Sequence, residues 1–117
     1  IAPILWDEDR KVDIARIANA IAKLLQCDLE LSPSDILNSD EYIGERYGVL
    51  TQEGRDALKL VAETEGIFLD PVYTSKAMAG MIDQIRKGII TKNETVVFIH
   101  TGGLPALFAY AEDLMLS

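Results

Sequence analysis

EGIFLDPVYTSKAMAG, residues 65–80, joins an apolar strand-like segment to the start of a helix. Pro71 forces Asp70 toward an extended backbone, and either Thr74 or Ser75 is placed to cap the helix that follows. A simple turn at this point would use Gly, Pro or Asn. The junction instead carries a phenol, two hydroxyls and an amine, which indicates a chemical role.

Apolar residues at steps of three and four predict amphipathic helices on both sides of this junction. Thr51 is a good N-cap for the preceding helix, and Gly66 is a good stop for it. The spacing predicts four helices, over residues 9–26, from Thr51 to Gly66, from the junction to Gly88, and from Pro105 through Leu114. We expect a long irregular connection over residues 32–48, where turn-forming residues gather.

Short apolar runs between these helices predict β-strands. DLEL at residues 28–31 alternates, and TVVFIH at residues 95–100 is almost entirely apolar, as a strand covered on both faces should be. Strands separated by helices predict an α/β fold, a partial three-layer parallel sheet flanked by helices. IAPIL at residues 1–5 resembles the middle of a β-strand rather than its beginning. A parallel sheet of so few strands would also leave its edge strands unpaired. Both features suggest a fragment of a longer protein.

The composition narrows the classes of function. The net charge of −8 disfavours a nucleic-acid backbone as the ligand. No apolar run approaches the ~20 residues that cross a bilayer. Cys27 is the only cysteine and His100 the only histidine. An internal disulfide is therefore impossible, a zinc site is not expected, and a reducing cytoplasmic setting fits best.

HTGG, residues 100–103, lies where the predicted strand 95–100 gives way to the last helix. Ligands of parallel sheets gather at such strand ends, and the helix start favours an anion. If this turn lies beside the junction, Tyr73, Thr74 and Thr101 converge on one pocket. We expect His100 to be a buried, hydrogen-bonded histidine and Lys76 to be solvated.

Two long runs make the likeness to a known family specific. EGIFLDPVYTSKAMAGMIDQIRKG followed by VVFIHTGGLPALFAY closely resembles the C-terminal part of D-cysteine desulfhydrases, and the YG of ERYGVLTQEG also fits. These enzymes stand with the 1-aminocyclopropane-1-carboxylate deaminases among the pyridoxal-phosphate enzymes of the tryptophan-synthase-β fold type. The resemblance implies that residues 1–117 are a C-terminal fragment of the large pyridoxal-phosphate-binding domain.

The resemblance also implies roles for individual residues. Tyr73 would lie against the cofactor ring with its phenol near the reacting carbon, and Tyr47 would be a second proton donor or acceptor from the long loop. The hydroxyls of Thr74 and Thr101, with Gly102 beside them, would line the cofactor near its pyridine nitrogen. Lys76 has no covalent role in this pattern.

The two threonines distinguish the sibling activities. The deaminases that the sequence resembles carry a glutamate at the position of Thr74 and a leucine at that of Thr101. A carboxylate would keep the pyridine nitrogen protonated and strengthen the electron sink, whereas a hydroxyl offers one neutral hydrogen bond of about 1 kcal/mol. Thiolate is a good leaving group, so we expect β-elimination of D-cysteine to pyruvate, ammonia and hydrogen sulfide.

The family's Schiff-base lysine and glycine-rich phosphate loop belong to an N-terminal portion that this sequence does not contain. We therefore expect the chain to be inactive alone and to need that portion. The full-length relatives that it resembles are commonly dimeric, so a homodimer partner is also expected. The sequence leaves open a 1-aminocyclopropane-1-carboxylate deaminase, a non-catalytic α/β module that binds a partner chain, and, less favoured, a phosphate or nucleotide site at HTGG.

Overall fold

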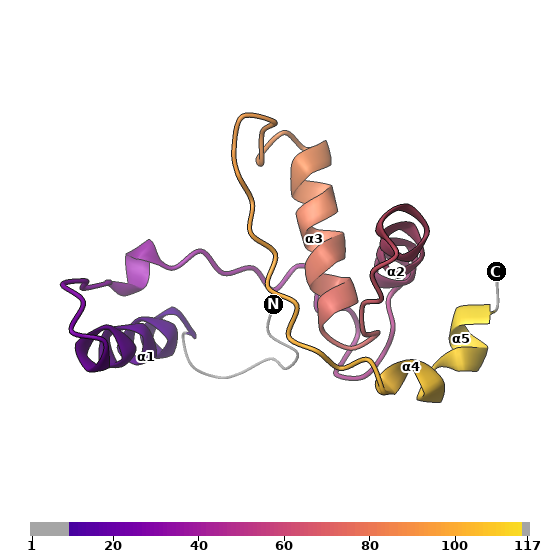
Figure 1. Ribbon diagram of the computed structural model, residues 1–117, viewed down its shortest axis with the longest axis horizontal. Helices are drawn as coiled ribbons and strands as arrows, with labels where there is room; N and C mark the ends of the chain where they lie inside the picture. The colour runs from indigo at the N-terminus through magenta and orange to yellow at the C-terminus, as the bar shows by residue number, and fades with distance from the viewer. Residues whose placement is uncertain (1–9, 116–117) are drawn as a thin grey trace. The chain divides into compact units, whose positions relative to one another are not determined.

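The computed structural model describes residues 10–115 and divides into two compact units, whose described parts are residues 10–40 and 41–115 (Figure 1). Each unit has its own local order, so each is described separately. The strand predicted over residues 1–5 lies outside the described residues.

In the unit of residues 10–40, α1 (Arg10–Leu24) confirms the helix predicted over residues 9–26. The Asn19 amide group holds the backbone of Leu31 by two hydrogen bonds, donating to its carbonyl oxygen at 2.9 Å and accepting from its N–H at 2.8 Å. A short 3₁₀ helix, η1 (Pro33–Asp35), interrupts the predicted irregular connection. The apolar stripe of α1 is only partly covered, because Ile17 and Ile21 are each 50% exposed.

In the unit of residues 41–115, α2 (Gln52–Glu65) begins and ends as predicted. The Thr51 hydroxyl accepts a hydrogen bond from the Gly54 N–H at 3.0 Å, which satisfies one of the unpaired donors of the first turn. Gly66 ends the helix in the left-handed conformation, with φ of 66°. The N-cap and the stop were both readable from the sequence.

The next helix, α3 (Thr74–Arg86), departs from the prediction at its start. Thr74 is the first residue of the helix rather than its cap, and Ser75 has no hydrogen-bond partner for its buried hydroxyl among the described residues. The expectation that one of them caps the helix was wrong, because Asp70 takes that role. The predicted stop is confirmed, since α3 ends just before Gly88.

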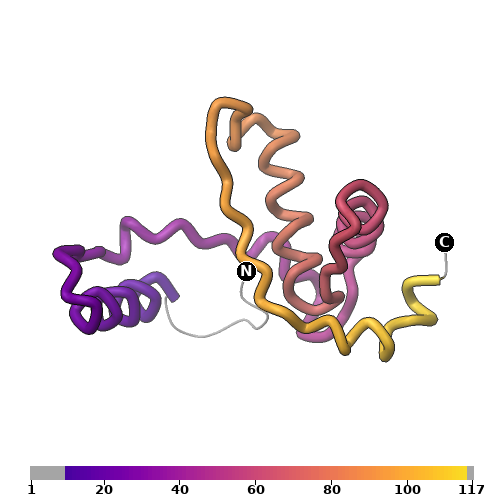
Figure 2. The backbone as a smooth tube through the Cα atoms, viewed as in Figure 1, coloured from indigo at the N-terminus to yellow at the C-terminus, as the bar shows by residue number. Residues whose placement is uncertain are grey.

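Apolar side chains of α2 and α3 form the core of this unit, with the segment between them closing one end (Figure 1). Its members are Ala57, Leu58, Val61, Leu69, Met78 and Ala79. After α3 the chain turns back (Figure 2). Phe98 in this returning segment packs against the core. The predicted last helix is divided at Tyr110 into α4 (Ala106–Ala109) and α5 (Ala111–Met115).

The predicted parallel sheet is not present, and that prediction was wrong: residues 10–115 contain no strand. A strand exists only when its backbone pairs with a neighbour, and residues 95–102 make no backbone–backbone hydrogen bond to another described segment. The same holds for the strand expected over residues 28–31, whose one long-range hydrogen-bond partner among residues 10–115 is the Asn19 side chain. Side chains of this segment still alternate between two sides although its backbone is not paired in a sheet. Phe98 packs against the core, whereas Val97 and Ile99 on either side of it are 81% and 75% exposed.

Within the described part of the chain, no helix has both the length and the apolar character needed to cross a membrane.

Candidate functional site

Asp70 organises the turn that leads into α3. Its carboxylate accepts hydrogen bonds from the backbone N–H groups of Val72, Tyr73 and Thr74, at 2.8, 2.8 and 2.7 Å. The first N–H groups of a helix have no acceptor within the helix, and a negative charge is favourable at this end of the helix dipole. One side chain therefore both caps α3 and shapes the turn before it.

Thr74 and Asp70 also bind each other through a closed pair of hydrogen bonds. The Thr74 hydroxyl donates to Asp70 Oδ1 at 2.7 Å and accepts from the Asp70 N–H at 2.7 Å. Both residues are buried. The only proton of this hydroxyl is thus committed to Asp70, while one of its two lone pairs stays available as an acceptor.

Burial pushes the pKa of the Asp70 carboxyl upward, but the hydrogen bonds from Thr74, Tyr73 and Val72 together outweigh it, and the net pKa lies below its usual range. Hydrogen bonds that stabilise the charged form act in this direction. Asp70 is therefore held as an ionised, fully engaged carboxylate at the base of the turn.

Tyr47 and Tyr73 bring two phenols together on the surface of the same unit. Their hydroxyl oxygens are 2.5 Å apart, and their ring centroids are 5.9 Å apart with an angle of 60° between the planes. The two side chains are about half exposed, at 52% and 44%. The hydrogen bond with Tyr47, followed by burial and nearby negative charge, raises the pKa of the Tyr73 phenol. One phenol donates to the other, and the pair remains open to a ligand.

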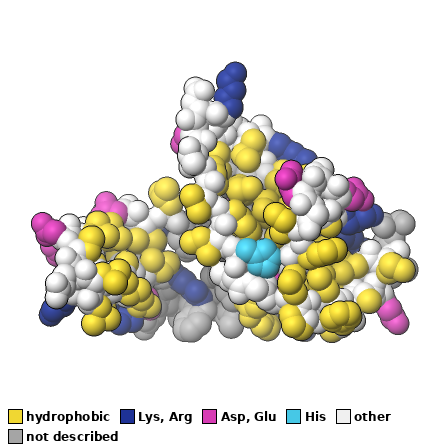
Figure 3. Space-filling model, viewed as in Figure 1, with side chains coloured by type: hydrophobic (Ala, Val, Ile, Leu, Met, Phe, Trp, Pro, Cys, Tyr) yellow, Lys and Arg dark blue, Asp and Glu magenta, His cyan; other side chains and the backbone are white. Residues whose placement is uncertain are grey.

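The turn of residues 100–103 lies against the Asp70 turn. His100 Nε2 is 2.8 Å from the Phe68 carbonyl oxygen, and its Nδ1 accepts from the Gly102 N–H at 3.1 Å. An added Cβ on Gly103 would come within 2.8 Å of Asp70 Cβ, and φ there is +87°, so only glycine suits this approach. His100 is hydrogen-bonded as expected, but the expectation that it is buried was wrong, because it is exposed among hydrophobic side chains (Figure 3).

These contacts account for the five residues that the sequence analysis selected. Tyr47 and Tyr73 meet directly, and Thr74, the residue after Tyr73, is buried. Thr101 and Gly102 belong to the neighbouring turn, whose Gly103 touches Asp70. The Thr101 hydroxyl is exposed and has no hydrogen-bond partner within residues 10–115. The structure thus brings the two turns side by side, while the roles of these five residues remain predictions.

Asp70 was missed as a functional residue. From the sequence, Asp70 was expected only to have an extended backbone before Pro71, although an aspartate shortly before a helix start is itself a capping signal. Lys76 was also misread, since it is 3% exposed rather than solvated. An amine near a helix N-terminus normally points to water, and nothing in the local sequence indicates that a distant carbonyl receives it.

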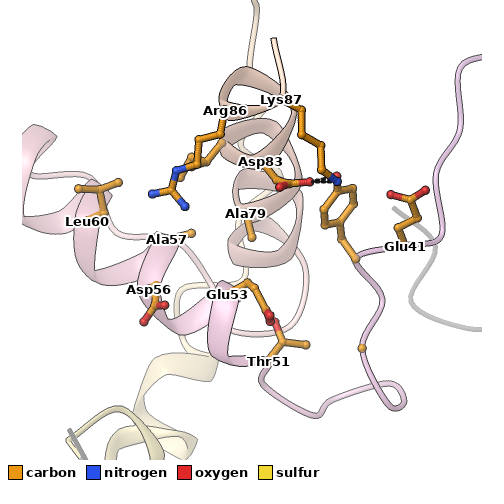
Figure 4. A pocket seen from close by; sticks show the side chains of 13 residues that line it. Glu41, Thr51, Glu53, Asp56, Ala57, Leu60, Ala79, Asp83, Arg86 and Lys87 are labelled. Carbon is orange, nitrogen blue, oxygen red and sulfur yellow. Dashed lines mark hydrogen bonds and ion pairs between the residues drawn. The ribbon is translucent and has the colours of Figure 1, made fainter. Parts of the chain in front are cut away.

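A cavity of about 400 Å³ lies elsewhere in this unit, between α2 and α3 (Figure 4). Ala57 and Ala79 line its apolar part, and Arg86 points across it from α3. Asp83 at its edge binds Lys87 at 2.7 Å. None of the five selected residues lines this cavity, so it lies apart from the site that the sequence indicates.

Comparison with known proteins identifies the family. Residues 5–102 match the sequence profile of a family described as pyridoxal-phosphate dependent enzymes. The match covers most of the chain, and the chain belongs to this family. Its members are enzymes that use pyridoxal phosphate, which is therefore the cofactor of the parent enzyme.

One solved structure is also similar to this chain. It is described as the crystal structure of an ACC deaminase homologue, with 34% sequence identity and a TM-score of 0.77. The likeness covers 97% of this chain and 33% of the other, so the chain spans about a third of that relative's length. The similarity supports the resemblance to the 1-aminocyclopropane-1-carboxylate deaminase and D-cysteine desulfhydrase group.

The side chains around the two turns fit part of such a cofactor. Tyr73 offers an aromatic surface against which a flat ring can stack, and Thr101 offers an uncommitted hydroxyl. Lys76 does not offer its amine, because Nζ is enclosed and donates to the Ile43 carbonyl oxygen. The described residues therefore suit the ring of pyridoxal phosphate.

We expect Asp70→Asn to lower the free energy of unfolding by about 1–3 kcal/mol, because an amide cannot accept all the hydrogen bonds that the carboxylate accepts. The pKa of Asp70 is depressed on folding, so its contribution is full above the unfolded-state pKa of about 3.9 and is lost as pH falls through the lower folded-state value. Urea unfolding of the full-length protein at a series of pH values measures this difference.

The matched control for this substitution is Asp28→Asn, which makes the same change at an exposed aspartate. It should leave the unfolding free energy within about 0.5 kcal/mol of wild type. A wild-type advantage over Asp70→Asn that stays constant from pH 7 to below pH 3 would contradict the role of the charge.

Proposed function

We propose that residues 1–117 are the C-terminal part of the large cofactor-binding domain of a D-cysteine desulfhydrase-like lyase, which eliminates sulfide from D-cysteine to give pyruvate and ammonia. The observation that carries the proposal is the pair of phenols, Tyr47 and Tyr73, hydrogen-bonded at 2.5 Å at the turn that leads into α3. Family membership favours an enzyme over the non-catalytic module that the sequence also allowed.

The polar groups of the two turns suit a reaction in which the leaving group departs easily, such as the elimination of thiolate. The nearby carboxylate, Asp70, is buried and already accepts four hydrogen bonds from Val72, Tyr73 and Thr74. The pyridine nitrogen of a bound cofactor would then meet a neutral hydroxyl rather than a free carboxylate. Pyridoxal phosphate supplies the electron sink when bound, and expulsion of thiolate demands less of that sink than opening a cyclopropane.

The tyrosine pair can hold and move a proton at a fixed place. The raised pKa of Tyr73 keeps its phenol protonated at neutral pH, so it can donate a proton, and its hydrogen bond with Tyr47 lets the second phenol replace it. General acid–base catalysis by a positioned side chain contributes typically about 10²–10⁴-fold to a rate. Tyr47 and Tyr73 are the residues that we propose as catalytic, with Thr74, Thr101 and Gly102 on the cofactor side.

A 1-aminocyclopropane-1-carboxylate deaminase is the second candidate. The similar solved structure is described as an ACC deaminase homologue, which favours this substrate. Both activities would use an amino-acid substrate, pyridoxal phosphate and a lysine from the rest of the polypeptide. We further propose a cytoplasmic location and assembly as a homodimer for the full-length protein.

We expect the full-length protein with pyridoxal phosphate to have a kcat/KM for D-cysteine at least about tenfold above that for 1-aminocyclopropane-1-carboxylate, a difference of ~1.4 kcal/mol in transition-state free energy. Sulfide release measures the first activity, and 2-oxobutyrate formation the second. A preference for the cyclopropane substrate would overturn the assignment in favour of the deaminase.

We expect Thr101→Leu to lower kcat for D-cysteine by about fivefold, the equivalent of one neutral hydrogen bond of ~1 kcal/mol. Thr101→Ser, which keeps the hydroxyl, should remain close to wild type. Steady-state kinetics on both variants with saturating cofactor make the comparison. Equal rates for the leucine and serine variants would show that the hydroxyl has no part in the reaction.

A further inference from the structure

Lys76 is a buried amine for which the proposed mechanism has no use. It is the third residue of α3 and is 3% exposed. Its Nζ donates a 2.6 Å hydrogen bond to the carbonyl oxygen of Ile43, which is 33 residues earlier in the chain. This is the one acceptor that the described residues provide for Nζ.

The burial of this amine is energetically unfavourable. Desolvation lowers the pKa of Lys76, and the positive end of the α3 dipole also disfavours a cation in the first turn. An apolar side chain would fill the same space without this cost. The presence of a lysine at this position therefore needs another explanation. The geometry offers one, which is the hydrogen bond from its amine to the loop at Ile43.

The Ile43 loop is closely fitted where Lys76 reaches it. Ile43 is itself buried. The next residue, Gly44, has a φ of +78°, and an added Cβ there would come within 2.3 Å of Thr51 Cγ2 and 3.7 Å of Lys76 Nζ. The loop thus turns sharply at the lysine, in a conformation and a space that only glycine accepts.

Tyr47 lies four residues beyond the bond from Lys76, and its hydroxyl meets that of Tyr73. Tyr73 stands immediately before α3, and Lys76 lies three residues after it. The start of α3 therefore holds residues 43–47 at both ends, through a buried amine at one end and an exposed phenol at the other. Of these two groups only the Lys76 amine is buried, so water cannot take the place of its hydrogen bond to Ile43.

Two more tyrosines hold the flanks of this loop. The Tyr42 hydroxyl donates to Asp83 Oδ2 at 2.6 Å, and the Tyr110 hydroxyl donates to the Gly48 carbonyl oxygen. Because these bonds fix the loop on either side, loss of the central anchor should displace the segment between them without releasing the whole loop. The segment that remains free to move is the one that carries Tyr47.

We propose that Lys76 is a positioning residue for the reaction: its hydrogen bond to the Ile43 carbonyl oxygen sets the loop that presents the Tyr47 phenol to Tyr73. The proposal rests on the proposed function only in giving the tyrosine pair a catalytic task. The placement of Tyr47 by Lys76 is a structural claim that can be tested without any substrate.

The kinetic test is a double-mutant cycle of Lys76→Met and Tyr47→Phe in the full-length enzyme with pyridoxal phosphate. We expect Lys76→Met alone to lower kcat by about tenfold or more, since a 1 Å misplacement can cost about 10²-fold. In the Tyr47→Phe background it should cause less than about a twofold further loss, because residues that act through one another are non-additive. Lys92→Met, the same change at an exposed lysine, is the matched control and should leave kcat unchanged.

The structural test labels the tyrosines with 3-fluorotyrosine and assigns the ¹⁹F signal of Tyr47 from its loss in Tyr47→Phe. Lys76→Met should shift or broaden this signal while those of Tyr42 and Tyr110 stay in place, and Lys92→Met should change none of them. If Lys76→Met does not fold, Lys76→Gln takes its place with the same expectations, because its shorter side chain does not span the distance to the Ile43 carbonyl oxygen.

An unchanged Tyr47 signal, an unchanged kcat, or losses that multiply in the double mutant would overturn the proposal. A wild-type enzyme inactive on both amino acids would contradict the proposed function instead. In that case the ¹⁹F comparison alone decides the placement of Tyr47 by Lys76.

Discussion

The Asp70 carboxylate is the interaction on which the candidate site depends. It accepts the N–H groups of Val72, Tyr73 and Thr74 and the Thr74 hydroxyl, all within 2.8 Å. Because these donors belong to successive residues, one side chain fixes the direction of the turn and the first turn of α3 together. Tyr73 leaves the turn toward solvent as a result, while Thr74 points inward.

The same carboxylate limits what can lie beside it. Gly103 approaches so closely that any side chain there would collide with Asp70, and His100 joins the same turn to the Phe68 carbonyl oxygen. The turn of residues 100–103 is therefore positioned by its contacts with the Asp70 turn and the residues before it. This contact sets the turn that carries Thr101 and Gly102 against the Asp70 turn, with no strand among residues 41–115 to align the two. The two turns and the tyrosine pair all belong to the unit of residues 41–115, whose core is formed by the packing of α2 on α3.

Local signals in the sequence predicted the helices of this chain well. Thr51 and Gly66 mark the two ends of α2, and Gly88 follows the end of α3, because caps and stops act within one turn of the chain. Pro105 and Leu114 also bracket a helical region, but the break at Tyr110 has no such local signal. The resemblance to a known family predicted pyridoxal phosphate as the cofactor, and the family match supports this prediction.

Signals that depend on distant partners failed. The run of residues 95–100 has the apolar composition of a strand, yet composition cannot state whether a neighbouring backbone is present to pair with it. Lys76 was expected in water because its acceptor, Ile43, lies far away in sequence. The capping role of Asp70 is a different case, because its partners are local and the signal from Pro71 concerns only its backbone. Tyr47 and Tyr73 were selected through family likeness, and their direct contact was not foreseen.

Amide hydrogen exchange of Val72, Tyr73 and Thr74 in the full-length protein tests the central role of Asp70 most directly. These N–H groups lie at the start of a helix, where amides without an intrahelical acceptor ordinarily exchange fast. If the carboxylate binds them as described, they should exchange as slowly as amides in the middle of α3, and Asp70→Asn should remove that protection. Fast exchange in the wild-type protein, at rates typical of an open turn, would contradict the account.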